Sequence, residues 1–263
     1  MNTKKKKQNR VRGRSKRILC LFFLSVLTVI CYIAYCDYRE DEKQEKRFEQ
    51  LVKLEEERDL SPAPRYSKEM ENKDWIGWLN IDNTSISYPV MQRNGDGEYY
   101  LHRDFDGNYS VYGTPFLDAR CTLSSDNCII YGHNISGGRM FGLLHSYTEE
   151  SFYKEHPKVK FRSGNEKHLY QIISVIKTDT TSPVYSFIDL GNWQEYRDYV
   201  TFILSHSLYQ TTMGKQIETV LERTSSEDFF HRYQFLTLST CRSWIGRDAR
   251  LLVIAAKEKV KNQ

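Results

Sequence analysis

The chain has 263 residues, of which 40% are hydrophobic and 13% aromatic, and this composition excludes a disordered polypeptide. Its formal net charge is +4, but residues 1–17 contain nine Lys and Arg and no acidic residue. The 38 basic residues less these nine leave 29, against 34 acidic ones, so the rest of the chain carries a formal charge of −5. A mildly acidic body excludes a nucleic-acid-binding surface, which needs clustered positive charge on the folded part.

An uncharged apolar run, ILCLFFLSVLTVICYIAY, follows the basic segment and is about as long as a membrane-crossing helix. It predicts a transmembrane signal anchor over residues 18–36. The bases before the run and the acidic DYREDE after it predict that residues 1–17 form a cytoplasmic tail and that the remainder lies outside the membrane. A cleaved signal peptide is the alternative, but the run is longer than a typical signal-peptide core, and no small-x-small cleavage site follows it.

Residues 37–64 are dense in charge and predict a helical stalk that links the anchor to the folded part. Phe48, Leu51 and Val52 give a narrow apolar stripe at helical spacing, and the SPAP sequence at residues 61–64 ends the predicted helix. The stripe fits a solvated spacer, with a partner-binding helix as the alternative.

Residues 65–263 are predicted to form the folded domain outside the membrane, and their pattern is mainly β. Short apolar or alternating runs separated by Gly, Asn and Asp indicate strands, and eight such runs favour a closed barrel, which leaves no free edge. A long helix is predicted over residues 192–208, where Asn192 and Glu195 resemble a capping pair, and a shorter helix over residues 140–147. The predicted strands are residues 75–81, 85–91, 114–119, 128–133, 158–163, 168–178, 233–240 and 250–257.

The six cysteines do not form a disulfide scaffold, because three of them lie in or beside the apolar run. Cys121 and Cys128 flank the turn-like TLSSDN sequence and form either a disulfide or two separate thiols. Cys241 is then left unpaired. An unpaired cysteine outside the membrane is either a reactive group or a buried, inert one.

The candidate catalytic residues all lie at predicted strand ends. Cys241 follows the strand FLTLST, and His133 ends the strand CIIYGH before the glycine-bearing loop NISGG. Arg250 opens the apolar strand LLVIAA, so an antiparallel pair of the last two strands would place it beside Cys241. Arg247 is a second basic residue in the same loop, but Arg250 is the one that adjoins the strand. His102 has charged neighbours and is expected to be structural.

TLSTC followed by an arginine that opens an apolar strand, with IIYGHN upstream and an N-terminal anchor, resembles the sortases, membrane-bound cysteine transpeptidases of Gram-positive bacteria. The resemblance runs from about residue 75 to residue 257. The blocks WLNIDNTSISYPVMQ, YYLHRDFDGNYSVYGTPFLDA and NCIIYGHNISGGRMFGLL are similar to class B in particular.

The resemblance implies the fold, an eight-stranded sortase-type β-barrel with a long helix before the cysteine strand, and the chemistry. In residues 65–263, the implied catalytic domain, Cys241 would attack the carbonyl carbon of a threonine in the C-terminal sorting signal of a secreted protein. Arg250 would stabilise the oxyanion, and His133 would act as acid and base. The resemblance also places Tyr131 and Ser239 in the substrate groove, and specificity in about residues 178–235. No metal or other cofactor is implied.

The implied acceptor is an amine of a peptidoglycan precursor (lipid II), which would join the secreted protein to the cell wall. Three alternatives stay open: a sortase that polymerises pilins through a lysine, a cysteine hydrolase that uses water, and a non-catalytic anchored binding module. Capture of the acyl group by an added amine separates a transpeptidase from a hydrolase, and indifference to loss of Cys241 would identify a binding module.

Overall fold

The computed structural model describes residues 2–60, 71–223, 229–241 and 248–259 of the chain. Two compact units divide the chain, residues 1–50 and residues 51–263. The boundary predicted at residue 65 lies outside the described residues, and the last turns of the predicted stalk, from Leu51 onward, belong to the second unit.

The first unit is formed by helix α1 (Asn2–Leu60), which extends ten residues into the second unit. The predicted anchor and stalk are one continuous helix, because no Pro or other strong helix breaker separates them. The described part of this helix, Cys20–Arg58, is long and apolar enough to cross a membrane. A signal sequence near an N-terminus meets the same criteria of length and composition. Apolar side chains of this part, such as Phe23 and Ile30, are more than half exposed.

The second unit contains a closed eight-stranded barrel with the strand order β1-β2-β3-β4-β7-β8-β6-β5, which confirms the predicted fold. Each of the eight predicted segments overlaps one of the strands, and β4, β6, β7 and β8 extend one or two residues beyond the predicted bounds. Their bounds are β1 (Trp75–Asn80), β2 (Ser87–Met91), β3 (Phe116–Leu117), β4 (Asn127–Tyr131), β5 (Lys158–Ser163), β6 (Glu166–Asp179), β7 (Tyr233–Cys241) and β8 (Ala249–Glu258).

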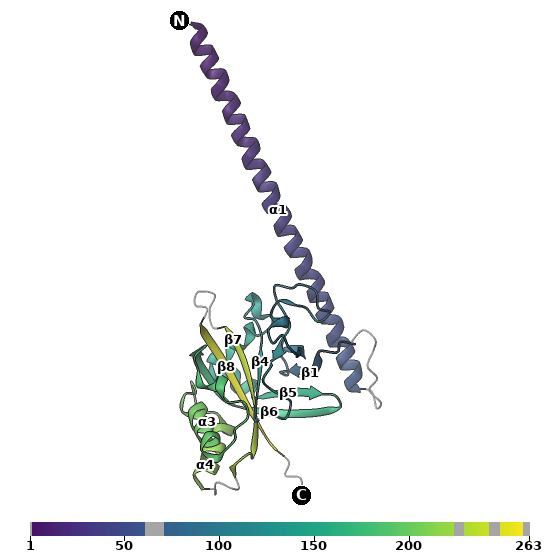
Figure 1. The fold of residues 1–263 in the computed structure, drawn as a ribbon, viewed down its shortest axis with the longest axis vertical. Coiled ribbons are helices and arrows are strands. Elements are labelled where there is room, and N and C mark those ends of the chain that lie inside the picture. Colours follow the sequence, from purple (N-terminus) through teal and green to yellow (C-terminus); the bar gives the residue numbers. More distant parts are fainter. Residues whose placement is uncertain (1, 61–70, 224–228, 242–247, 260–263) are drawn as a thin grey trace. The chain divides into compact units, whose positions relative to one another are not determined.

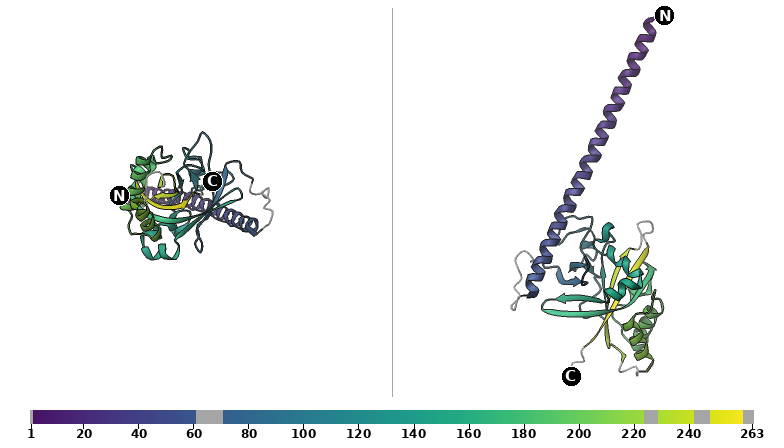
Figure 2. Two further views of the ribbon diagram at one scale, coloured as in Figure 1. Left: turned by 90° about the horizontal axis from the view of Figure 1, so that it is seen from below. Right: turned by 180° about the vertical axis from the view of Figure 1, so that it is seen from behind.

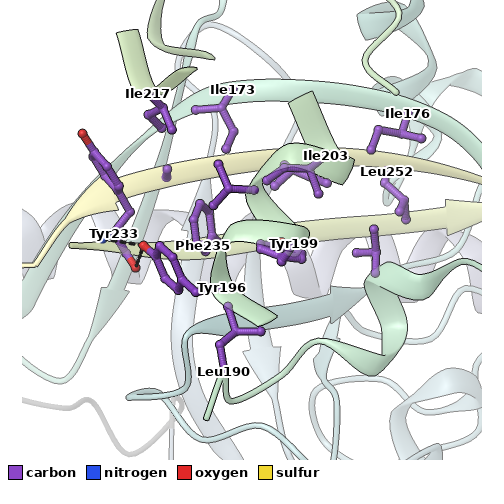
Figure 3. Close-up of a cluster of buried hydrophobic side chains, with 14 of the residues drawn as sticks. Ile173, Ile176, Leu190, Tyr196, Tyr199, Ile203, Ile217, Tyr233, Phe235 and Leu252 are labelled. Carbon is purple, nitrogen blue, oxygen red and sulfur yellow. Dashed lines mark hydrogen bonds between the residues drawn. The ribbon is translucent and has the colours of Figure 1, made fainter. Parts of the chain in front are cut away.

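Two helices cover the outer face of β6, β7 and β8. They are α3 (Trp193–Ser205) and α4 (Thr212–Arg223), and they lie together at one side of these strands in Figure 1 and in the right-hand view of Figure 2. Tyr196 and Tyr199 of α3 pack on Phe235 of β7, with ring centroids 5.8 and 5.0 Å apart (Figure 3). This core lies on the face of β7 opposite to the barrel interior, so the strand that ends in Cys241 is packed on both sides.

The two predicted helical segments follow the sequence pattern, each with one difference. Asn192 caps α3 as expected by accepting a hydrogen bond from the Glu195 amide at 3.0 Å, while the Glu195 carboxylate accepts from the amide of Gly191 rather than from that of Asn192. The predicted helix over residues 140–147 is a 3-10 helix, Gly142–Thr148, followed by the short α2 (Glu150–Glu155).

Helix α4 was not predicted, because a glycine near its start weakens the helical signal. A Cβ atom at Gly214 would lie 2.7 Å from the carbonyl oxygen of Ile173, so this glycine lets α4 approach β6 closely.

A buried carboxylate fixes the start of β4. Asp126 accepts hydrogen bonds from the amide of Leu190 at 2.9 Å, from Nδ1 of His231 at 2.9 Å and from Nζ of Lys259 at 2.7 Å. Burial alone would raise the pKa of Asp126, but the hydrogen bonds from Lys259, Leu190 and His231 hold it below its ordinary value. The Asp126 carbonyl also accepts from the amide of Phe235 at 2.7 Å, which ties the start of β4 to β7.

We expect Asp126→Asn to lower the free energy of unfolding by about 1–3 kcal/mol, because it replaces the buried charged acceptor of three hydrogen bonds with a neutral amide. Thermal unfolding of the full chain, followed by tryptophan fluorescence, measures the change. Asp189→Asn is the matched control, because Asp189 lies nearby and is exposed. Equal melting temperatures for the two variants would show that the Asp126 cluster does not hold the barrel.

Candidate active site

The predicted catalytic residues come together at one rim of the barrel because β4 and β7 are parallel neighbours. Their register pairs Tyr131 with Ser239, and the amide of Gly132 donates to the carbonyl of Ser239 at 3.1 Å. Gly132 and His133 follow the end of β4, and continuing the same register by two residues would bring His133 level with Cys241. The carboxyl ends of parallel strands meet at the same edge, so the pairing itself brings together two residues that are 108 positions apart.

Arg250 joins this rim through the other neighbour of β7. Strands β7 and β8 are antiparallel, and Cys241 and Arg250 are direct register partners, as the sequence predicted. Arg250 also faces Thr178 of β6 in register, is half-buried, and donates from Nη1 to the carbonyl of Ala249 at 3.2 Å. Arg247, the alternative arginine, lies outside the described residues.

The imidazole of His133 is held in one tautomer by the backbone. Its Nε2 lies 2.8 Å from the carbonyl oxygen of Leu101, in the 3-10 helix Tyr99–His102. A carbonyl oxygen only accepts, so Nε2 carries a proton in the neutral ring and Nδ1 does not. Proton exchange with a reacting group therefore falls to Nδ1.

The surroundings of His133 keep its ring neutral. Burial lowers the pKa of His133, the hydrogen bond to Leu101 opposes this shift, and the nearby ring of His102 lowers the pKa further. The centroids of the two imidazole rings are 5.5 Å apart. Because the charged form is the one that burial and a second imidazole disfavour, His133 is mostly unprotonated at neutral pH.

A glycine sets the path of the chain just before His133. A Cβ atom at Gly132 would lie 2.6 Å from ring carbons of Phe141, so a larger residue would displace this ring. The carbonyl of His133 accepts from the Phe141 amide at 2.9 Å. The ring and the hydrogen bond together fix the backbone from which the imidazole projects.

The predicted groove residues Tyr131 and Ser239 lie in one hydrogen-bonded aromatic cluster. Ser239 Oγ is 2.9 Å from the hydroxyl of Tyr185, and the Tyr131 and Tyr185 rings stack with centroids 6.2 Å apart. The hydroxyl of Tyr131 donates to Asp118 Oδ2 at 2.9 Å. Burial alone would raise the pKa of Asp118, but hydrogen bonds from Arg120 and Tyr131 hold it below its ordinary value. Ser239 is only 1% exposed, and this hydrogen bond connects its hydroxyl to Tyr185, which is half-buried.

Sequence reasoning missed three residues that support this site. Leu101 and Asp118 lie in blocks that resemble the family, but the Leu101 contact is made by a backbone carbonyl, which no side-chain pattern reveals. Tyr185, in the 3-10 helix Pro183–Ser186, lies in the segment expected to carry specificity, without a local motif. Among the described residues, no three His, Cys, Asp or Glu side chains gather to hold a metal ion.

Comparison with known proteins gives the family. The model of the sortase domain matches residues 79–258. Sortase B of Staphylococcus aureus (strain NCTC 8325 / PS 47) is 31% identical over 193 residues, which cover 73% of this chain and 72% of that protein. Sortase B of Listeria monocytogenes serovar 1/2a is 31% identical over 188 residues, which cover 71% of this chain and 70% of that protein.

A solved structure, a Staphylococcus aureus sortase B-substrate complex, superposes with a TM-score of 0.68 at 26% identity and covers 84% of this chain and 99% of that one. The family model, the two relatives and this structure agree with the barrel and with the order of its sequence blocks. The chain therefore belongs to the sortase family of cysteine transpeptidases, and the proteins that it resembles here are sortases of class B.

Proposed function

We propose that this sortase cleaves the C-terminal sorting signal of secreted proteins after a threonine, and that it transfers the acyl group from Cys241 to an amine of a peptidoglycan precursor. The observation that carries the proposal is the register of β4, β7 and β8, which brings His133, Cys241 and Arg250 to one rim of the barrel.

In this proposal Cys241 is the nucleophile and Arg250 stabilises the oxyanion. Attack of the thiolate on the threonine carbonyl forms a tetrahedral intermediate, and its collapse breaks the peptide bond and leaves a thioacyl enzyme. The developing oxygen anion needs a fixed donor, and a guanidinium directly opposite Cys241 in register supplies charge and two parallel N–H groups.

His133 is proposed to move protons through Nδ1. As neutral imidazole it first accepts the proton of the Cys241 thiol, which leaves the attacking thiolate, and as imidazolium it then donates this proton to the departing amine. Neutral again, it accepts a proton from the incoming amine and returns it to the departing Cys241 thiolate. The hydrogen bond from Nε2 to Leu101 survives these steps, because Nε2 keeps its proton throughout. The backbone therefore orients the ring while Nδ1 gains and loses its proton.

The proposed location is the outer face of the cell membrane. The basic residues 1–17 would stay in the cytoplasm, residues 18–36 would anchor the chain, and residues 37–64 would link the anchor to the catalytic domain. Support comes from α1, whose described part Cys20–Arg58 is long and apolar enough to cross a membrane. An enzyme whose substrates are secreted proteins and lipid-linked wall precursors needs its site at this surface.

The substrate class rests on the relatives and on the aromatic cluster. The similar Staphylococcus aureus sortase B was solved as a complex with substrate. In this chain Tyr131 and Ser239 are proposed to bind the sorting signal, Tyr131 through its half-buried ring and Ser239 through its hydrogen bond to Tyr185.

The central test is incubation of the full chain in detergent with pooled peptides of the form x-P-x-T-x and excess glycinamide, with products read by mass spectrometry. We expect amine-capped peptide cut after threonine, and its loss in Cys241→Ala and His133→Ala. Cleavage to the free acid regardless of the amine would identify a hydrolase. Normal product from Cys241→Ala would contradict the proposed nucleophile.

For the oxyanion role, we expect Arg250→Ala to lower kcat by about 100- to 1,000-fold, as loss of an oxyanion donor does in other enzymes. Arg250→Lys keeps the charge without the planar fork and should recover only part of the rate. The matched control is Arg232→Ala, which removes an arginine paired with Glu258 near the other end of β8. A decrease for Arg232→Ala as large as that for Arg250→Ala would remove the specific role of Arg250.

A third prediction concerns the protonation of His133. We expect an NMR titration of its ring to have a midpoint below pH 6.5, because burial disfavours the imidazolium. His102→Gln should move the midpoint upward, since it removes a neighbouring imidazole, whereas His145→Gln should not, because His145 is not among the groups that shift the pKa of His133. A wild-type midpoint above 6.5 would show that the site favours the charged ring.

The proposed binding of the sorting signal through Ser239 and Tyr185 is tested by measuring KM for the peptide. Ser239→Ala and Tyr185→Phe each remove one partner of the same hydrogen bond, so each should raise KM by about 2- to 10-fold, with little added effect in the double variant. Full additivity of the two changes would mean that Ser239 and Tyr185 contact substrate independently.

A further inference from the structure

A pocket lies toward the end of the barrel opposite to the rim that carries His133 and Cys241. It has a volume of about 890 Å³ and is lined by residues of β3 to β8 and of the adjoining loops. Lys257 in its wall is seven residues along β8 from Arg250, and Gln234 is seven residues before Cys241 on β7. At about 3.3 Å per residue, this places the pocket roughly 20 Å from the rim.

The pocket combines an apolar floor with a polar mouth. Small-molecule sites commonly have this construction, with volumes of about 300–1,000 Å³. The apolar floor is formed by Leu117, Ile130, Phe161 and Leu236, and the polar mouth by Glu166, His168, Tyr170, Gln234, Lys257 and Glu258.

Most polar groups of the mouth already have protein partners. Tyr170 donates to Gln234 Oε1 at 3.0 Å, and the Gln234 amide nitrogen donates to the carbonyl oxygens of Leu123 and Ser125 at 2.8 and 2.9 Å. Lys259 pairs with Asp126 at 2.7 Å. These groups therefore offer little to a ligand without breaking existing bonds.

Lys257 is the exception. Its Nζ lies 2.9 Å from Nδ1 of His168 and 5.2 Å from the centroid of the Tyr170 ring. Among the described residues no Asp or Glu forms an ion pair with it, although it is half-buried. Glu258, its neighbour in sequence, pairs with Arg232. His168 links Lys257 to a carboxylate, since its Nε2 lies 3.4 Å from Glu166 Oε2, but among the described ion pairs Lys257 itself has no direct counter-charge.

Burial outweighs the nearby carboxylate in the electrostatics of this pair. Burial lowers the pKa of Lys257, and burial together with Lys257 lowers the pKa of His168. Glu166 acts in the opposite direction on both pKa values, but the lowering by burial is larger.

We propose that this pocket binds a small amphipathic carboxylate, with its head at Lys257 and its apolar body against Leu117, Ile130, Phe161 and Leu236. A single negative charge fits, because the half-buried Lys257 has no Asp or Glu in direct contact among the described ion pairs. The site is separate from the active-site rim and is independent of the proposed transpeptidation.

Isothermal titration calorimetry of the full chain in lipid nanodiscs with 4-phenylbutanoate tests the proposal. We expect binding with a Kd below about 1 mM, and at least tenfold weaker binding of 4-phenylbutanol, which keeps the apolar body and lacks the charge. Lys257→Met should weaken 4-phenylbutanoate binding at least tenfold, while Lys257→Arg should keep it within about threefold. Lys177→Met, an exposed lysine on β6, is the matched control and should bind normally.

A carboxylate could also bind to Arg250, so the Arg250→Met variant distinguishes binding at the active-site rim from binding at Lys257. Unchanged binding in Arg250→Met, and no displacement by an x-P-x-T-x peptide, place the ligand at Lys257. Equal binding of the acid and the alcohol, or full binding by Lys257→Met, overturns the proposal. So does the absence of binding by wild-type chain that melts normally.

Discussion

The parallel pairing of β4 with β7 is the constraint on which the catalytic rim depends. An antiparallel pair would send His133 and Cys241 to opposite ends of the barrel. In the parallel register, both residues follow the same pair, Tyr131 and Ser239, by two positions. The antiparallel β8 then adds Arg250 opposite Cys241. Barrel closure makes this arrangement rigid, since every strand has two hydrogen-bonded neighbours.

Packing outside the barrel secures the same strands. Helix α3 covers β7 with buried aromatic rings, and α4 adds Ile217 to the same core. Asp126, the residue before β4, is bonded to the loop before α3 and to Lys259, the residue after β8. The side chains at the rim are in turn fixed by neutral hydrogen bonds, from His133 to a carbonyl and between Ser239 and Tyr185. The fold thus orients the side chains at the rim, and the few groups that change charge during the proposed reaction lie there.

The strands and the adjacency of Cys241 and Arg250 were predictable, because alternating apolar runs and a tight connection between neighbouring strands are local signals. The parallel partner of β7 was not, since no local pattern says which distant strand completes a barrel. The sequence resemblance supplied His133 instead. Helix α4 escaped because Gly214 lowers helix propensity, although close contact with Ile173 requires it. The Leu101 carbonyl and Tyr185 depend on how loops fold back, which composition does not encode.

The account rests on an acyl group carried by Cys241. Its most direct measurement is the intact mass of the full chain, quenched in acid shortly after mixing with a cleavable x-P-x-T-x peptide and without added amine. We predict a mass increase equal to the peptide through its threonine, located on Cys241 by fragmentation, and its disappearance when glycinamide is added before the quench. An unmodified chain during active turnover, or an adduct on another residue, would contradict the account.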